Sequence, residues 1–194
     1  MRLSDTINTI RPATFAEKAA TRLIGVSGGI DVTLPYPHAG WINVADSQYT
    51  SAARLTILSG IKTQLTINGL GASTNRDYAD GMHSDVWSDN RFKPFALGDV
   101  YNLRLTCTMS QSNAGTGNYV IFDADIGTDA VPFLAAEQSV QLVKGQGVAT
   151  LTTISAPFFC LDTFGRNGAR LFLTPSTDIT VWGLAIFIQR TFTP

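Results

Sequence analysis

Charged side chains are scarce in this sequence. Lys, Arg, Asp and Glu make up 15% of its 194 residues, against ~25% in typical soluble domains. The 14 basic and 15 acidic residues give a formal net charge of -1, and the basic residues are scattered singly. A protein that binds nucleic acid needs a basic stripe to contact the phosphates. We therefore expect no nucleic-acid partner, and a surface built mainly from Ser, Thr, Asn, Gln and Gly.

Histidine and cysteine are scarce as well. The chain has two histidines, His38 and His83, and two cysteines, Cys107 and Cys160. Both histidines lie in stretches expected to be exposed loops, and neither cysteine has a histidine close in sequence, so no nucleophile and base are paired. Two cysteines form no disulfide framework, and we expect both to be small buried residues that stay reduced in a cytoplasm. The sequence predicts no catalytic residues and no enzyme activity.

Long apolar runs are also missing. Charged residues interrupt residues 1–29, so we expect no secretory signal there. The most apolar window, residues 179–188, is about half as long as a membrane helix requires and is predicted to be a buried strand. We therefore expect no membrane partner.

Metal and cofactor motifs are incomplete. Residues 123–129, DADIGTD, have a spacing similar to that of a calcium loop, but no Glu closes it and its first residues alternate like a strand. We expect Asp123 and Asp125 to lie on a solvated strand face, and calcium binding is the less favoured alternative. The glycine pairs at 69 and 71 and at 145 and 147 lack the third glycine and the helix of a phosphate cradle. No metal or cofactor site is predicted.

From residue 28 onward, short runs of β-branched and aromatic residues alternate with polar ones, and Gly, Pro, Asn and Asp separate the runs. This pattern, with no helix predicted inside it, indicates an all-β protein with an antiparallel double sheet. The strands at 54–58 and 62–67 are predicted to form a hairpin, and residues 69–90 a functional or interfacial loop. The other predicted strands are residues 30–34, 41–44, 100–109, 119–125, 140–143, 148–154, 158–161, 169–173 and 179–188.

Residues 1–29 differ from the rest of the chain. Residues 14–23 are predicted to be helical, because they follow Pro12, are rich in Ala and place Glu17 three residues after a possible Thr14 cap. Apolar residues also recur at positions 3, 7 and 10 of an otherwise polar stretch. We interpret residues 1–29 as an N-terminal arm that becomes ordered by docking on another subunit, and residues 30–194 as the main domain.

Several aromatic residues lie in predicted turns or at strand starts, where amphipathic rings suit a subunit interface or a sugar-binding platform. An interface is favoured, because sugar sites usually add convergent carboxylates or amides. Inside the last strand, Trp182 is predicted to pack in the core or on a symmetry axis, and Gly183 to mark a bulge or a close backbone approach. The turn aromatics are Tyr36, Trp41, Tyr49, Tyr78 and Trp87.

Three segments resemble parts of phage virion jelly-roll proteins, whose fold is similar to that of tumour necrosis factor and complement C1q. Residues 95–106 and 118–127, FALGDVYNLRLT and NYVIFDADIG, resemble the middle strands of these proteins. Residues 178–188, DITVWGLAIFI, resemble the last strand, which has a glycine inside an apolar run. The resemblance covers about residues 30–192 and implies an antiparallel jelly-roll sandwich.

The resemblance also implies a role and partners. It implies a homotrimer in the virion of a tailed bacteriophage, assembled in the bacterial host cytoplasm. The favoured role is a capsid decoration (cement) protein that binds the major capsid protein of the head. The alternative is the receptor-binding knob of a head or tail fibre, which binds a glycan or protein of the host surface. The short segment before the jelly roll favours the first, since fibres usually carry a long shaft.

Overall fold

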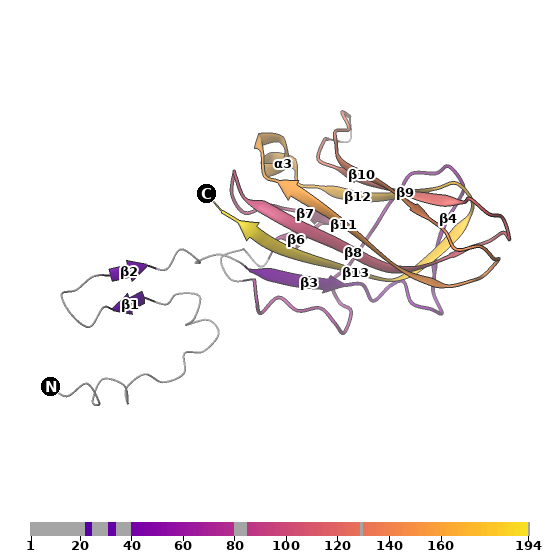
Figure 1. The fold of residues 1–194 in the computed structure, drawn as a ribbon, viewed down its shortest axis with the longest axis horizontal. Helices are drawn as coiled ribbons and strands as arrows, with labels where there is room; N and C mark the ends of the chain where they lie inside the picture. Colours follow the sequence, from indigo (N-terminus) through magenta and orange to yellow (C-terminus); the bar gives the residue numbers. More distant parts are fainter. Residues whose placement is uncertain (1–21, 25–30, 34–39, 80–84, 129, 194) are drawn as a thin grey trace.

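Two antiparallel β-sheets packed face to face make up the body of the protein (Figure 1). The computed structural model describes residues 22–24, 31–33, 40–79, 85–128 and 130–193. The first sheet has the order β11 (Thr150–Phe159), β8 (Val100–Gln111), β13 (Ile179–Phe192), β3 (Trp41–Ala45), and β4 (Leu55–Ile57) also pairs with β13. The second sheet has the order β10 (Leu134–Gln141), β9 (Tyr119–Asp125), β12 (Arg170–Pro175), β5 (Thr63–Gln64).

The chain crosses repeatedly between the two sheets. After β8 in the first sheet it forms β9 and β10 in the second, returns for β11, crosses again for β12 and ends with β13 at the centre of the first. A five-stranded and a four-stranded sheet connected in this way form a jelly roll, the double Greek key of antiparallel strands. The predicted fold class, an antiparallel jelly-roll sandwich, is confirmed.

Strand β8 shows why these residues form strands. Tyr101, Leu103, Leu105 and Cys107 are fully buried, and the residues between them face outward, as the period of two predicts. Strand β13 has the same alternation but changes its phase once. The buried positions Ile179 and Val181 are odd-numbered, whereas the next ones, Leu184 and Ile186, are even-numbered.

The change of phase in β13 occurs at a bulge. The register with β8 shifts between Trp182 and Ala185, and Gly183 between them has a φ of 62°, in the left-handed region that favours glycine. The predicted bulge at Gly183 is confirmed. It lets one long strand keep its apolar side chains on the core face along its whole length.

The predicted hairpin between residues 54–58 and 62–67 is wrong. β4 pairs with β13 in the first sheet and β5 pairs with β12 in the second, so the turn between them passes from one sheet to the other. Gly60 donates its N–H to the oxygen of Pro175 at 2.7 Å, and Ser59 donates to a carboxylate oxygen of Asp178 at 2.8 Å. These bonds fix the turn against the segment between β12 and β13. Alternation predicts a strand but does not identify its partner.

Several other elements differ from the prediction. A short helix, α3 (Asp162–Asn167), lies where no helix was expected, and β10 begins six residues before the predicted 140–143. β11 runs unbroken through Pro157, because it is the edge strand of its sheet and one missing N–H is tolerated there. At the end of the predicted loop 69–90, β6 (Trp87–Ser88) lies inside the loop and pairs with β7 (Arg91–Phe92), which directly follows it.

Near the N-terminus the structure describes one pair of short strands. β1 (Arg22–Ile24) pairs with β2 (Asp31–Thr33), and β2 lies inside the predicted strand 30–34. The predicted helix at 14–23 falls outside the described residues except for its last two positions, which belong to β1. No helix in the described ranges is long and apolar enough to cross a membrane.

The sandwich core contains a cluster of aromatic rings around Phe92, which is fully buried. Its ring meets those of Tyr101, Phe158 and Phe164 edge to face, with centroids 5.0, 5.6 and 5.1 Å away. Edge-to-face contacts of this kind add to the stability that burial itself provides. Because the rings come from β7, β8, β11 and α3, the cluster joins four elements at one end of the sandwich.

Replacing Phe92 with alanine should lower the free energy of unfolding by ~3 to 5 kcal/mol, the cost of removing a buried aromatic ring and leaving a cavity. Urea unfolding at a fixed protein concentration measures the loss. Phe95→Ala is the control, because Phe95 is 55% exposed and should cost much less. Equal losses for both variants would contradict the assignment of Phe92 to the core.

Candidate functional site

The outer face of the first sheet almost lacks charge. Outward-facing residues of β3, β8, β11 and β13 lie side by side in rows across the sheet, and Arg104 is the one charged side chain among them. The row through Arg104 consists of Ser155, Arg104, Phe187 and Asn43. The next row contains Thr153, Thr106 and Ala185.

The outer face of the second sheet is different. Asp123 of β9 lies opposite the exposed Glu137 of β10 and pairs with Lys62, whose side chain is 39% exposed. Charged residues are depleted at the centres of protein interfaces, while aromatic residues and Arg are enriched there. By this criterion the first sheet, and not the second, presents the candidate interaction surface.

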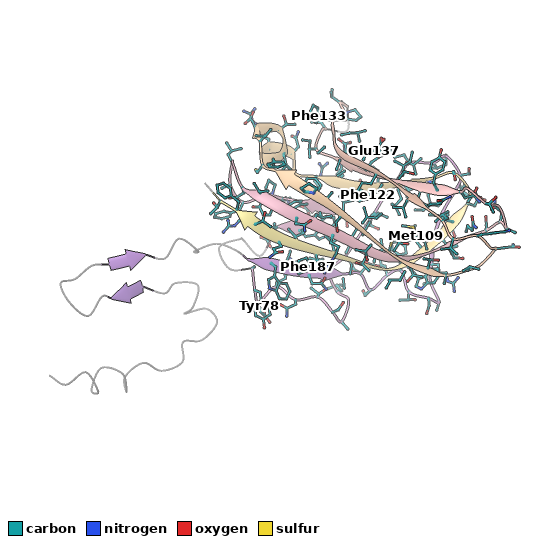
Figure 2. All side chains as sticks on the ribbon, in the orientation of Figure 1. Tyr78, Met109, Phe122, Phe133, Glu137 and Phe187 are labelled. Atoms are coloured by element: carbon teal, nitrogen blue, oxygen red, sulfur yellow. The ribbon has the colours of Figure 1, made fainter. Side chains whose placement is uncertain are left out.

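A stack of three aromatic rings lies on this face. Trp41 stacks on Tyr78 with centroids 4.7 Å apart and on Phe187 with centroids 5.5 Å apart. The guanidinium carbon of Arg104 lies 4.8 Å from the centre of the Phe187 ring, so the stack ends in a cation over an aromatic face. Figure 2 labels Tyr78 and Phe187 at the two ends of the ring stack.

The five turn aromatics therefore separate in the structure. Trp41 and Tyr78 come together, whereas Trp87 is buried and donates its indole N–H to the oxygen of Ile67 at 3.0 Å. Tyr49 is half-buried and packs against the core, and Tyr36 lies outside the described residues. Phe187 was not among the predicted aromatics, because it looked like one more residue of an apolar strand.

Trp182 is also on the outer face. It is half-buried, and the guanidinium carbon of Arg54 lies 4.1 Å from the centre of its ring. The prediction that Trp182 packs in the core of the subunit is wrong, because the bulge at Gly183 changes the phase of the strand after it. Packing of Trp182 on a symmetry axis stays a prediction.

The aspartates of the apparent calcium loop are engaged with the protein itself. Asp125 is almost fully buried; one carboxylate oxygen accepts the N–H groups of Gly127 and Phe133, each at 2.8 Å, and the other pairs with Arg170 at 2.9 Å. Asp123 is also buried, and Lys62 lies 3.0 Å from it. The prediction of a solvated strand face is therefore wrong for both residues.

The environment of Asp125 changes its acidity. Burial raises the pKa of this carboxyl, but hydrogen bonds from Phe133 and Gly127 and the positive charges of Arg170 and Lys62 outweigh burial, and the pKa lies below its ordinary value. The charged form is therefore the one that the fold stabilises. Asp125 closes the loop between β9 and β10 and ties it to β12.

A second buried ion pair lies at the end of the sandwich near the C-terminus. Asp99 and Arg190 are fully buried, with a carboxylate oxygen of Asp99 3.4 Å from the Arg190 guanidinium. Tyr101 donates its hydroxyl to the same oxygen at 2.7 Å and accepts the N–H of Phe95 at 2.7 Å. Burial, with the negative charge of Asp99, raises the pKa of the Tyr101 hydroxyl. The cluster is structural and fixes the segment before β8.

The cysteines are buried, as predicted, and burial makes them unreactive. It raises the pKa of Cys107 to about 12, and together with the nearby Asp99 it raises the pKa of Cys160 to about 11. His38 and His83 lie outside the described residues. Within the described ranges, no group of three or more His, Cys, Asp or Glu is placed to hold a metal ion.

Scanning the sequence against models of known families gives no match, and a search of curated proteins gives none either. Among solved structures, Eiger TNF from S. frugiperda is similar, with a TM-score of 0.43 and 6% identity over 81% of this chain and 95% of that chain. PRD1 vertex protein P5 is similar with a TM-score of 0.40 and 15% identity over 77% of this chain and 72% of that one. Dimeric latent PorU from Porphyromonas gingivalis is similar with a TM-score of 0.43 and 9% identity. The match covers 79% of this chain and 13% of the PorU chain. These likenesses concern the fold alone.

The ion pair of Asp125 predicts a dependence of stability on pH. Because its folded pKa lies below the unfolded value of ~3.9, the pair contributes fully above about pH 4, and the contribution is lost as pH falls through the folded pKa. Asp125→Asn should lower the free energy of unfolding at pH 7 by ~3 kcal/mol, since Arg170 stays buried beside a neutral amide.

The measurement is urea unfolding of the parent and of Asp125→Asn at pH 7 and pH 3. The parent should lose more stability on acidification than the variant. Asp162→Asn is the control, because this carboxylate pairs with Arg166 at the exposed surface and should change little. The account of Asp125 fails if parent and variant lose the same stability between the two pH values.

Proposed function

We propose that this protein is a structural component of a tailed-bacteriophage particle, and that it acts as a trimeric decoration protein that stabilises the head. The observation that carries the proposal is the nearly uncharged outer face of the first sheet. A decoration protein acts mechanically. A trimer that bridges neighbouring major capsid proteins adds contact area, and this area must be broken before the shell opens.

The composition of the outer face supports a subunit interface. Leu151 on the edge strand β11 is 71% exposed, and the half-buried rings of Trp41, Trp182 and Phe187 lie on the same sheet. A wide surface of this kind, with aromatic residues and two Arg side chains over their rings, is typical of a protein–protein contact. Association of like copies usually follows a closed symmetry, and a threefold axis beside this sheet would bury the same face of each copy.

The alternative is the receptor-binding knob of a fibre, and the Trp41 and Tyr78 rings are the feature that favours it. Aromatic rings suit the apolar face of a sugar. Amides also lie near these rings: Gln189 is opposite Trp41 in the register of β13 with β3, and Asn43 donates to the carbonyl of Ser73 at 2.7 Å. The decoration role is preferred, because the whole outer face around the rings is wide and nearly uncharged, as in a protein–protein contact.

The trimer has a direct test in two matched substitutions. Thr153→Glu places a charge on the outer face of the first sheet, and Ser139→Glu places the same charge on the outer face of the second. Both residues are exposed and lie on edge strands, so neither change should unfold the subunit. Light scattering at micromolar concentration should give about three times the chain mass of 20.9 kDa for the parent and Ser139→Glu, and a smaller mass for Thr153→Glu. A parent that stays monomeric contradicts the proposal.

The role itself is tested with phage heads that lack this protein. Purified protein should bind such heads in numbers that saturate, and it should raise the temperature at which they release DNA. Thr153→Glu should bind less and protect less than Ser139→Glu, because bridging needs the trimer. Binding to host cells with no binding to heads would favour the receptor-binding knob and reject the decoration role.

A further inference from the structure

One end of the sandwich carries a group of exposed apolar side chains, which we call the apolar end. Its members are between 47% and 69% exposed: Phe95, Leu97, Phe133, Leu134, Phe159 and Leu161. A group of exposed apolar side chains on a soluble protein often marks a site that another segment or protein covers. In Figure 1, α3 and the end of β11 lie at this end, and Figure 2 labels Phe133 near α3.

The apolar end contains two hollows on either side of α3. One, of about 230 Å³, is lined by apolar residues that include Phe133, Phe159 and Leu161. The other, of about 250 Å³, is lined in part by Phe95 and Leu97. Each hollow has room for one or two apolar side chains, so the surface is shaped to receive an amphipathic segment.

The chain enters the sandwich beside this surface. The oxygen of Gly40, which precedes β3, accepts the N–H of Arg190 at 2.9 Å. The guanidinium carbon of Arg190 lies 5.3 Å from the centre of the Phe95 ring, and Phe95 belongs to the apolar end. Whatever precedes residue 40 is therefore tethered next to the exposed apolar side chains.

The tether is short. Arg22 lies opposite Thr33 in the antiparallel pairing of β1 with β2, so the two residues are neighbours in space although they are separated along the chain. The distance from Gly40 back to Arg22 is therefore limited mainly by the chain between Thr33 and Gly40. The chain from Thr33 to Gly40 has seven peptide steps and reaches at most ~23 Å. A segment held by a short tether is present at an effective concentration in the millimolar range. The point from which residues 1–21 extend is thus within a short chain length of the apolar end of the same copy.

The sequence of residues 1–21 fits this surface. Leu3, Ile7 and Ile10 recur at the spacing of one side of a polar segment, and Phe15 follows. We propose that residues 1–21 dock on the apolar end of their own copy, with these apolar side chains in the hollows beside α3. Docking on the same copy replaces the expectation that this arm becomes ordered on another subunit, because the short connection to Gly40 favours the nearest apolar surface. The proposal depends neither on the trimer nor on the virion role.

Trypsin cleavage after Lys18 tests the proposal on the full chain, because a docked segment is protected from proteolysis. The reference is a synthetic peptide of residues 1–24, cleaved at the same bond. Cleavage after Lys18 in the parent protein should be at least tenfold slower than in the peptide. Leu161→Asp should bring the rate close to that of the peptide, since a charge in the hollow repels the apolar segment.

The matched control is Leu70→Asp. Leu70 is 76% exposed, as Leu161 is 69% exposed, but it lies in the loop after β5 and not at the apolar end. Leu161 is the N-cap residue of α3, where Asp is favoured, so Leu161→Asp should fold. Phe133→Asp serves as a second variant of the apolar end. Ile7→Asp on the docking segment should release Lys18 to the same extent.

The outcomes separate cleanly. Slow cleavage in the parent and in Leu70→Asp, with fast cleavage in the apolar-end variants and in Ile7→Asp, supports the docking of residues 1–21. Cleavage of the parent at the rate of the peptide overturns it, and so does protection that survives both Leu161→Asp and Phe133→Asp. Protection that appears only after phage heads are added also overturns it, because the occupant is then the particle. Light scattering on the same samples reports the trimer independently.

Discussion

The long pairing of β8 with β13 is the constraint on which the other elements depend. The two strands lie side by side from Ile179 opposite Gln111 to Phe192 opposite Val100, at the centre of the first sheet. Strands β3 and β4 add to one side of this pair and β11 to the other. Because side chains alternate between the faces of a strand, the register of this pair decides which residues form the core and which face outward.

The bulge at Gly183 decides which side chains of β13 face the core and which face the candidate interaction surface. Without a change of phase, the second half of β13 would turn its apolar side chains outward. With it, Ile186 and Ile188 stay in the core, while Phe187 lies on the outer face beside Arg104 and Trp182 lies there beside Arg54. The same local irregularity thus completes the core and builds the aromatic surface that we assign to the subunit interface.

Some of the few charged side chains form ion pairs that are buried inside the fold. Asp125 with Arg170 closes the β9 to β10 loop, and Asp99 with Arg190 fixes the segment before β8. Removing one partner of a buried ion pair is costly, because the other charge stays buried without compensation. Both pairs join residues distant in sequence, and they hold fixed the two segments that bear Phe133 and Phe95 at the apolar end.

The sequence predicted the strands with regular alternation and the bulge, because both depend on local residue patterns. The partner of β4, the edge position that tolerates Pro157 and the buried state of Asp123 and Asp125 depend on contacts across the fold, and no local pattern contains them. The candidate surface was predicted only in part. Trp41 and Tyr78 were predicted as aromatics of turns or strand starts that suit an interface, whereas Phe187 joined them only through the register of β13 with β3.

The central claim is that the outer face of the first sheet is a contact surface between copies in a phage particle. Electron cryo-microscopy of the virion that bears this protein tests it most directly. The account predicts threefold density on the head, with β11, β8, β13 and β3 of each copy turned toward the axis. Density for single copies, or copies whose first sheet faces solvent, would contradict it.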